Sequence, residues 1–137
     1  MCHKVTFTHD SKELSAQFRN KNPQLPIGLK NNKTMLVKWG RRKTEDGNLP
    51  ISGWASLKSI ESGKWDMYFP KSVKLMVSDF SVKNNATKKY DKFSVTYGNF
   101  IQGLLARDGD EFRVYVVTIA PDNKDHICWP RILVDDK

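Results

Sequence analysis

The sequence is poor in the residues that build disulfide and metal sites. Its 137 residues include two cysteines, Cys2 and Cys128, and three histidines. Two cysteines are too few for a disulfide framework, and a reducing compartment keeps both as thiols. No histidine makes a paired zinc spacing with a cysteine. We therefore expect no disulfide scaffold, no metal site and no cofactor.

Long apolar runs are also missing. No apolar segment approaches the ~20 residues that span a bilayer. The start, from Met1 to Lys4, leads into a polar alternating stretch rather than the apolar region of a signal peptide. The sequence thus predicts a soluble, cytoplasmic protein without a membrane partner.

Negative charge is scarce relative to positive charge. The chain carries 23 Lys and Arg against 15 Asp and Glu, which gives a net charge of +8. A positive field of this size favours polyanionic partners, meaning nucleic acid or a membrane surface, and says nothing about the fold. The charge alone does not choose between these partners.

The length excludes a multidomain enzyme. A chain of 137 residues, 39% of them hydrophobic, is one domain with an ordinary core. A chain of this length buries roughly two-thirds of its unfolded surface, so it can fold without metals or disulfides. We expect a single domain over residues 1–137 that acts as a monomer.

Two segments carry the pattern of a helix. Asp10 followed by Glu13 has the spacing of an N-cap with its capping box, and Leu14 and Phe18 form an apolar i, i+4 pair. This pattern predicts a helix of about ten residues that ends near Asn20. Farther along, apolar residues at positions 54, 57 and 60 predict a short helix that stops before residue 63.

Most of the remaining sequence predicts strands and turns. Residues 20–34 are expected to be an irregular connection because of their prolines, and residues 83–92 an exposed, lysine-rich loop. Residues 108–110 form a hairpin turn signal, and residues 121–125 another turn. Expected strands cover residues 5–8, 35–39, 73–77, 93–97, 101–106, 112–119 and 131–134. The fold class is therefore α+β: a mainly antiparallel twisted sheet or partly open β-barrel with a few short helices.

Cys2 is the residue with the most specific chemistry. Removal of the initiator methionine, which is common when the second residue is small, would make Cys2 the N-terminal residue. Its α-amine, with a reference pKa of about 7.7–8.0, is partly neutral at physiological pH and can add to an aldehyde. The neighbouring thiol then closes the imine into a thiazolidine ring. The alternative is that Cys2 is only a small residue at the start of a strand.

His126 is the second candidate for chemistry. It lies between a turn and the last strand, where a histidine can act as an acid or base near neutral pH. Cys128 is two residues away, but neighbours at i and i+2 share one face of a strand, and no third group that would orient them is evident. A structural histidine remains the alternative.

Aromatic and basic residues occur together at two places. Trp39 is followed by Gly40, Arg41 and Arg42, a combination that can stack a base and hold a phosphate. Residues 65–71, together with Trp54, form a second aromatic and basic cluster, for which core packing is the alternative. The arginine pair is the better candidate, since it has no evident packing use.

In order and spacing, these features resemble the SOS response-associated peptidase family. The family begins Met-Cys, carries a Trp-Gly motif that matches Trp39-Gly40, and ends with a His-Asp-Arg-Met-Pro motif at the position of residues 126–130. Residues 52–56 stand where its Asn-Ala-Arg-Ala-Glu segment falls. The resemblance covers nearly the whole chain at low identity.

This resemblance implies recognition of abasic sites in single-stranded DNA during the SOS response, with nucleoid association on damage. Cys2 would capture the opened sugar aldehyde as a DNA–protein crosslink, and His126 would act in acid–base steps of lyase or crosslink-reversal chemistry. Residues expected to contact nucleic acid are Lys4, Trp39, Arg41, Arg42, Ser52 and Trp54.

The sequence departs from the family pattern at three motif positions. The family's glutamate corresponds to Val82, its asparagine to Ser52 or Gly53, and the arginine of its histidine motif to Cys128. Adduct formation through Cys2 is therefore expected, while lyase or self-processing activity that needs the carboxylate would be weak. A non-covalent single-strand binding module and an inactive regulatory homologue remain alternatives.

Overall fold

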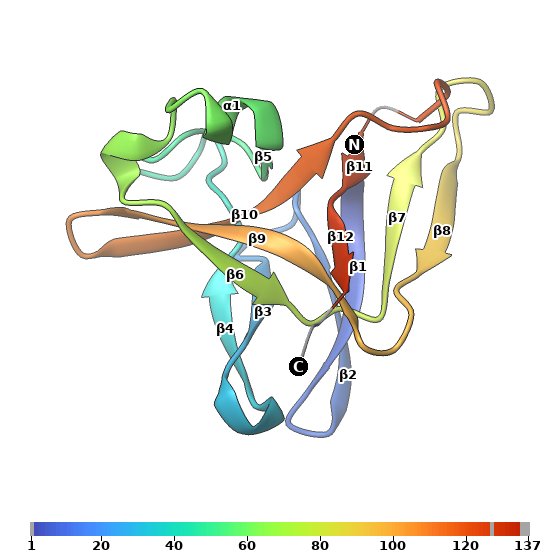
Figure 1. The fold of residues 1–137 in the computed structure, drawn as a ribbon, viewed down its shortest axis with the longest axis horizontal. Helices are drawn as coiled ribbons and strands as arrows, with labels where there is room; N and C mark the ends of the chain where they lie inside the picture. Colours follow the sequence, from blue (N-terminus) through green and yellow to red (C-terminus); the bar gives the residue numbers. More distant parts are fainter. Residues whose placement is uncertain (1, 127, 135–137) are drawn as a thin grey trace.

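The chain folds into two open, twisted sheets that are mainly antiparallel, as the sequence predicts. The computed structural model describes residues 2–126 and 128–134. A four-stranded sheet has the strand order β2-β1-β7-β8, and an eight-stranded sheet has the order β11-β10-β9-β6-β3-β4 with β12 beside β9 and β5 beside β10 (Figure 1). Only the β5–β10 pair is parallel among the paired strands described.

The strands and helices have the following bounds. The four-stranded sheet contains β1 (Cys2–His9), β2 (Lys12–Gln17), β7 (Asp79–Lys83) and β8 (Tyr90–Ser94). The eight-stranded sheet contains β3 (Gln24–Gly28), β4 (Thr34–Lys38), β5 (Trp54–Ser56), β6 (Lys71–Leu75), β9 (Asn99–Asp108), β10 (Glu111–Ile119), β11 (Trp129–Pro130) and β12 (Ile132–Val134). The helical elements are η1 (Lys30–Asn32), α1 (Leu57–Glu61) and η2 (Asp66–Tyr68).

The core has two parts, one on each face of the eight-stranded sheet. Val114 and Val116 of β10 pack toward the four-stranded sheet, in one cluster with Phe80 and Val82 of β7. Tyr115 of β10 belongs to the other cluster, against which side chains of α1 pack. Because both faces of β10 are buried, its sequence is a continuous apolar run rather than an alternation.

The expected helix after Asp10 is wrong. Asp10 and Ser11 have φ angles of 50° and 65°, which form a two-residue hairpin turn between β1 and β2. Leu14 and Phe18 are four residues apart, a spacing that puts side chains on one face of a strand as well as on one face of a helix. The pairing of β2 with β1, in which Leu14 is opposite Phe7, decides for the strand.

Besides β2, β5 and β11, the strands β3 and β7 were not predicted, and β8 begins earlier than predicted. β3 contains Pro26, whose carbonyl accepts a hydrogen bond from the Met76 N–H, so the proline is compatible with the sheet. β7 was missed, and β8 begins at Tyr90, inside the stretch expected to be a loop. The loop between them is thus restricted to residues 84–89.

The second predicted helix is shorter than expected. Trp54 lies in β5, and α1 begins at Leu57 behind Ser56, whose side chain accepts a hydrogen bond from the Ser59 N–H. Within the described residues, no helix has the length and apolarity to cross a membrane.

Candidate functional site: a histidine–aspartate pair at one end of the four-stranded sheet

The buried side chain of His126 lies beside a carboxylate. Its Nε2 is 2.9 Å from Oδ2 of Asp91, and the histidine side chain is 6% exposed. The same Oδ2 accepts a hydrogen bond of 3.0 Å from Nδ2 of Asn84. Because a carboxylate only accepts, Nε2 carries a proton, and Nδ1 is the basic nitrogen of the neutral ring. An imidazole oriented in this way can take up and return a proton.

Backbone contacts between two distant turns bring His126 to Asp91. Asn84, just after β7, forms an isolated β-bridge with His126. The Asn85 N–H donates to the Asp125 carbonyl at 2.7 Å, and the His126 N–H donates to the carbonyl of Asn123 at 3.0 Å. The segment before β11 is therefore held against the β7–β8 hairpin.

Aromatic rings form the wall around the imidazole. The ring of Trp129 is stacked on His126 with centroids 5.8 Å apart, and Phe93 meets the imidazole edge-on at 5.5 Å. A cavity of about 620 Å³ lies beside them and is also lined by Tyr90 and Asp122. This volume falls within the range of small-molecule sites, about 300–1,000 Å³.

The charge of Asp91 is fixed by its neighbours. The hydrogen bond with His126, followed by the one from Asn84, lowers the pKa of the Asp91 carboxyl below its ordinary value, and partial desolvation opposes this shift. Asp91 is therefore an anion at neutral pH. Its negative charge favours the tautomer of His126 in which Nε2 is protonated.

The sheet register places the backbone of Cys2 in line with this pair. Cys2 is opposite Val82 on β7, and Val82 is opposite Asp91 on β8. Two strand spacings of about 4.8 Å therefore separate the Cys2 and Asp91 backbones, or about 10 Å. In Figure 1, the start of β1 lies beside β7, at the end of the four-stranded sheet that carries the β7–β8 turn. Met1 and the side chain of Cys2 lie outside the described part of the structure.

Asp91 was absent from the predicted site. The sequence prediction placed it in an exposed loop, whereas it lies on β8 with its side chain on the same face as Phe93. The available signal was the alternation of residues 90–93, in which a carboxylate takes an inward position before an aromatic residue. Val82, at the position matched to the family's glutamate, is fully buried, and Asp91 is the carboxylate on the strand beside it.

Trp39 does not stack on nucleic acid, so that prediction is wrong. The side chain is fully buried, and its Nε1 donates to the Gly53 carbonyl at 2.9 Å. Gly40 follows with a φ of +54°, where a Cβ would collide with the Ser52 carbonyl. The Trp-Gly pair therefore forms part of the core and a left-handed turn.

Arg41 and Arg42 have a packing role, contrary to the prediction. Nη1 of Arg42 donates to the Phe18 carbonyl at 2.8 Å, Nη2 donates to the Trp39 carbonyl at 2.7 Å, and Nε lies 2.7 Å from Oε1 of Glu45. Nη1 of Arg41 donates to the Glu45 carbonyl at 2.8 Å. These donors fold the loop onto the core, so the structure does not favour them as phosphate contacts.

Glu45 is the acidic centre of this loop. Its Oε1 also lies 3.3 Å from Nη1 of the buried Arg113. Burial raises the pKa of Glu45, but hydrogen bonds from Arg42 and the charges of Arg42 and Arg113 outweigh this effect and lower it. The loop is held by an internal ion-pair network.

The other predicted nucleic-acid contacts lie in different environments. The Ser52 hydroxyl donates to the Trp54 carbonyl at 3.0 Å, within the backbone turn. Trp54 is half-buried against Phe18, with ring centroids 4.8 Å apart, and its buried Nε1 has no acceptor among the described residues. Lys4, on β1 opposite Ser81, is half-buried. The structure thus brings five of the six predicted residues together: the Trp39 and Trp54 rings lie 6.1 Å apart between centroids, and the Arg41 N–H donates to the Ser52 carbonyl at 3.0 Å. Most of their hydrogen-bonding groups are used within the fold, so the cluster does not present them as a nucleic-acid surface.

No protein-family model, curated protein or solved structure matches this chain.

Proposed function

We propose that this chain is a cytoplasmic, abasic-site sensor related to the SOS response-associated peptidase family. It binds single-stranded DNA and captures the aldehyde of an opened abasic sugar through Cys2, after removal of Met1. The register that aligns the backbone of Cys2 with Asp91, the partner of His126, is the observation that carries this proposal.

The covalent step is an addition followed by loss of water. The neutral α-amine of Cys2 attacks the aldehyde carbon, and the resulting carbinolamine loses water to give an imine. The thiol sulfur then adds to the imine carbon while its proton passes to the nitrogen. One C–N bond and one C–S bond form, one water leaves, and no oxidant or reductant is needed.

His126 supplies the proton transfers in this scheme. Nδ1 of the neutral imidazole accepts a proton from the attacking amine and returns it to the leaving hydroxyl. Asp91 stabilises the imidazolium that forms between these two transfers. The same pair supports a weak lyase activity, in which a base removes a sugar proton and the 3′ phosphate leaves.

Intact-mass analysis tests the proposal. The purified protein is weighed before and after incubation with a single-stranded oligonucleotide that carries one abasic site, and with the same oligonucleotide without it. We expect a protein lacking Met1, and an adduct equal to protein plus abasic oligonucleotide minus one water. Cys2→Ala should abolish the adduct, while the matched variant Cys128→Ala should retain it.

Two outcomes would overturn the proposal. The first is an equal yield of adduct from the Cys2→Ala protein. The second is absence of adduct from wild-type protein whose Met1 has been removed. If Cys2→Ser also leaves the affinity for intact single-stranded DNA unchanged, this second result assigns the chain to the non-covalent binding modules.

A further inference from the structure

A second cavity lies at the same end of the four-stranded sheet as Cys2. It has a volume of about 610 Å³ and lies between the chain segment after β2 and the loop after β4. Its lining includes Arg19, Lys21 and Lys43, all of them exposed. Gln17, the last residue of β2, is opposite Lys4 near the start of β1, and the chain then turns, with the Asn20 N–H donating to the Gln17 carbonyl at 3.1 Å. The cavity thus lies at the end of the four-stranded sheet where β1 begins.

The positive charge of this cavity is available to a ligand. Arg42 and Glu45 also line it, but they form an ion pair of 2.7 Å with each other. Lys21 and Lys43 form no ion pair within residues 2–126 and 128–134. Three cations therefore face one hollow without a compensating acid of their own.

A hydrogen bond connects this cavity to the one beside His126. Nη2 of Arg19 donates to the hydroxyl of Tyr90 at 3.3 Å, and Tyr90 also lines the His126 cavity. Arg19 follows β2 and Tyr90 begins β8, so the bond joins the two edges of the four-stranded sheet at the end where β1 begins. The start of β1 lies between these edges in the strand order.

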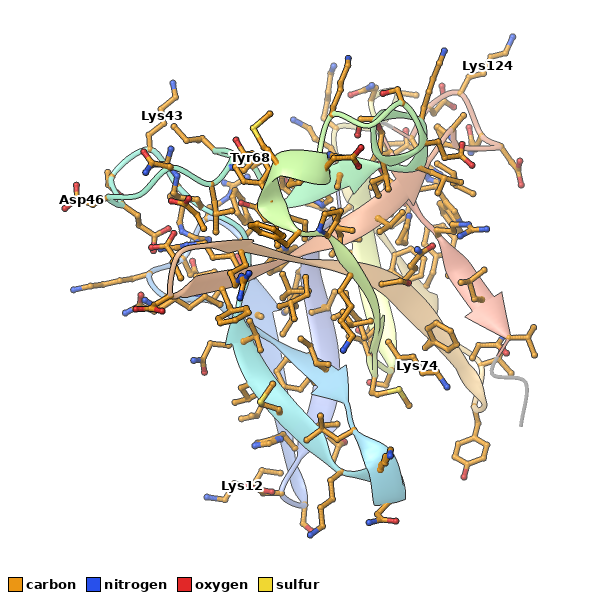
Figure 2. All side chains as sticks on the ribbon, turned by 60° about the vertical axis from the view of Figure 1, so that its left-hand side comes forward. Lys12, Lys43, Asp46, Tyr68, Lys74 and Lys124 are labelled. Carbon is orange, nitrogen blue, oxygen red and sulfur yellow. The ribbon has the colours of Figure 1, made fainter. Side chains whose placement is uncertain are left out.

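Basic side chains lie at both ends of the molecule, in separate groups. Figure 2 shows Lys43 and Lys124 projecting from one end of the molecule and Lys12 from the other, beside the β1–β2 turn. Lys30 and Lys33 line a separate cavity with Thr8, near that turn. These two basic surfaces are separate, and the one with Lys43 lies at the end of the four-stranded sheet where β1 begins.

We infer that Arg19, Lys21 and Lys43 bind the phosphodiester backbone of single-stranded DNA and lead the strand across the start of β1. Guanidinium and ammonium groups hold phosphates by charge-assisted hydrogen bonds. The exposed ring of Tyr90, 41% accessible, provides a surface on which a base can stack at the far edge. This inference rests on the proposed function. It assigns the phosphate contacts to Arg19, Lys21 and Lys43 instead of Arg41 and Arg42.

The test measures non-covalent binding, in which Cys2 has no part. Affinity of the Cys2→Ala protein for an intact, labelled single-stranded oligonucleotide is measured by fluorescence anisotropy from low to moderate salt. In this background, the cavity variant Arg19→Ala/Lys21→Ala/Lys43→Ala is compared with the control variant Lys12→Ala/Lys30→Ala/Lys33→Ala. Both variants lose three positive charges, so the net charge of the protein falls by the same amount in each.

The slope of log affinity against log salt concentration should be smaller by about 2 in the cavity variant, at ~0.7 for each lost phosphate contact. The control variant should keep the slope of the Cys2→Ala parent. An unchanged slope in the cavity variant would overturn the inference. An equal loss in both variants would also overturn it, because the overall charge would then explain binding. Crosslinking to abasic DNA is scored separately, so failure of the cavity and failure of capture by Cys2 give different results.

Discussion

The carboxylate of Asp91 on β8 accepts a hydrogen bond from the imidazole of His126, which lies just before β11, with 2.9 Å between Oδ2 and Nε2. Asn84 donates to the same oxygen, so the carboxylate is fixed on two sides. Aromatic rings cover the imidazole, and the histidine side chain is almost fully buried. In the alignment that the resemblance implies, the glutamate of the SOS response-associated peptidase family corresponds to Val82. Under the proposed function, Asp91 on the adjacent strand β8 takes the place of that carboxylate.

The first prediction concerns proton transfer by this pair. His126→Ala should slow adduct formation by about 10²–10⁴ without changing affinity for intact single-stranded DNA. Asp91→Asn should slow it less, because the imidazole remains but loses the negative charge that orients and stabilises it. Single-turnover kinetics across pH measure both effects. The double variant should be no slower than His126→Ala, since the two residues act as one unit.

Asp122→Asn is the matched control for the first prediction. Asp122 lines the same cavity, with no hydrogen bond to His126 in the described part of the chain, so its loss should leave the pH profile unchanged. A His126→Ala protein that matches wild type at every pH would make the histidine purely structural.

The second prediction is an acid-sensitive contribution of Asp91 to stability. The folded-state pKa of its carboxyl lies below the ordinary value of 3.8, so the unfolded chain binds the proton more readily. The stabilisation is therefore complete above a pH of about 4, and it is lost as the pH falls through the folded-state pKa. Urea unfolding from pH 3 to pH 7 should show wild type and Asp91→Asn converging toward low pH. A constant difference across that range would contradict this assignment.

The third prediction separates two neighbouring cations. Arg42→Ala should destabilise the fold by about 2–4 kcal/mol, because it removes the guanidinium donors to the Phe18 and Trp39 carbonyls and one of the two cations beside the half-buried Glu45. Lys43→Ala should change stability by no more than about 0.5 kcal/mol, since the side chain is exposed. Urea midpoints measure the difference. Equal midpoints for the two variants would show that the hydrogen bonds of Arg42 add nothing to stability.

The fourth prediction compares two tryptophans of one aromatic cluster. Trp39→Phe should cost about 2–3 kcal/mol, because it opens a cavity and removes one of the two hydrogen bonds that the Gly53 carbonyl accepts, the other coming from the Val116 N–H. Trp54→Phe should cost about 1 kcal/mol or less, since removing a buried donor that lacks an acceptor offsets part of the lost packing. Thermal and urea unfolding of both variants test this order. The reverse order would mean that the Trp54 N–H is satisfied in solution.

The sequence predicted the strands whose apolar pattern admits one interpretation. The residues of β10 are too continuously apolar for an exposed strand, and the Asp108–Asp110 turn before them has standard hairpin chemistry. The segment after Asp10 misled because the i, i+4 spacing of Leu14 and Phe18 suits both a helix and a strand. Pairing with β1, which local sequence does not encode, determined the outcome.

The sequence by itself determined the fold class, the excess of positive charge and the reactive groups that the chain contains, because these follow from composition and local pattern. Only the tertiary structure decided which of those groups meet. Trp39 and Arg42 match a nucleic-acid pattern in the sequence, yet their donors are used within the fold. Asp91 has no local motif, yet strand register and a turn far along the chain place it against His126. Contacts of this kind depend on how strands pair over long sequence separations, which no local periodicity specifies.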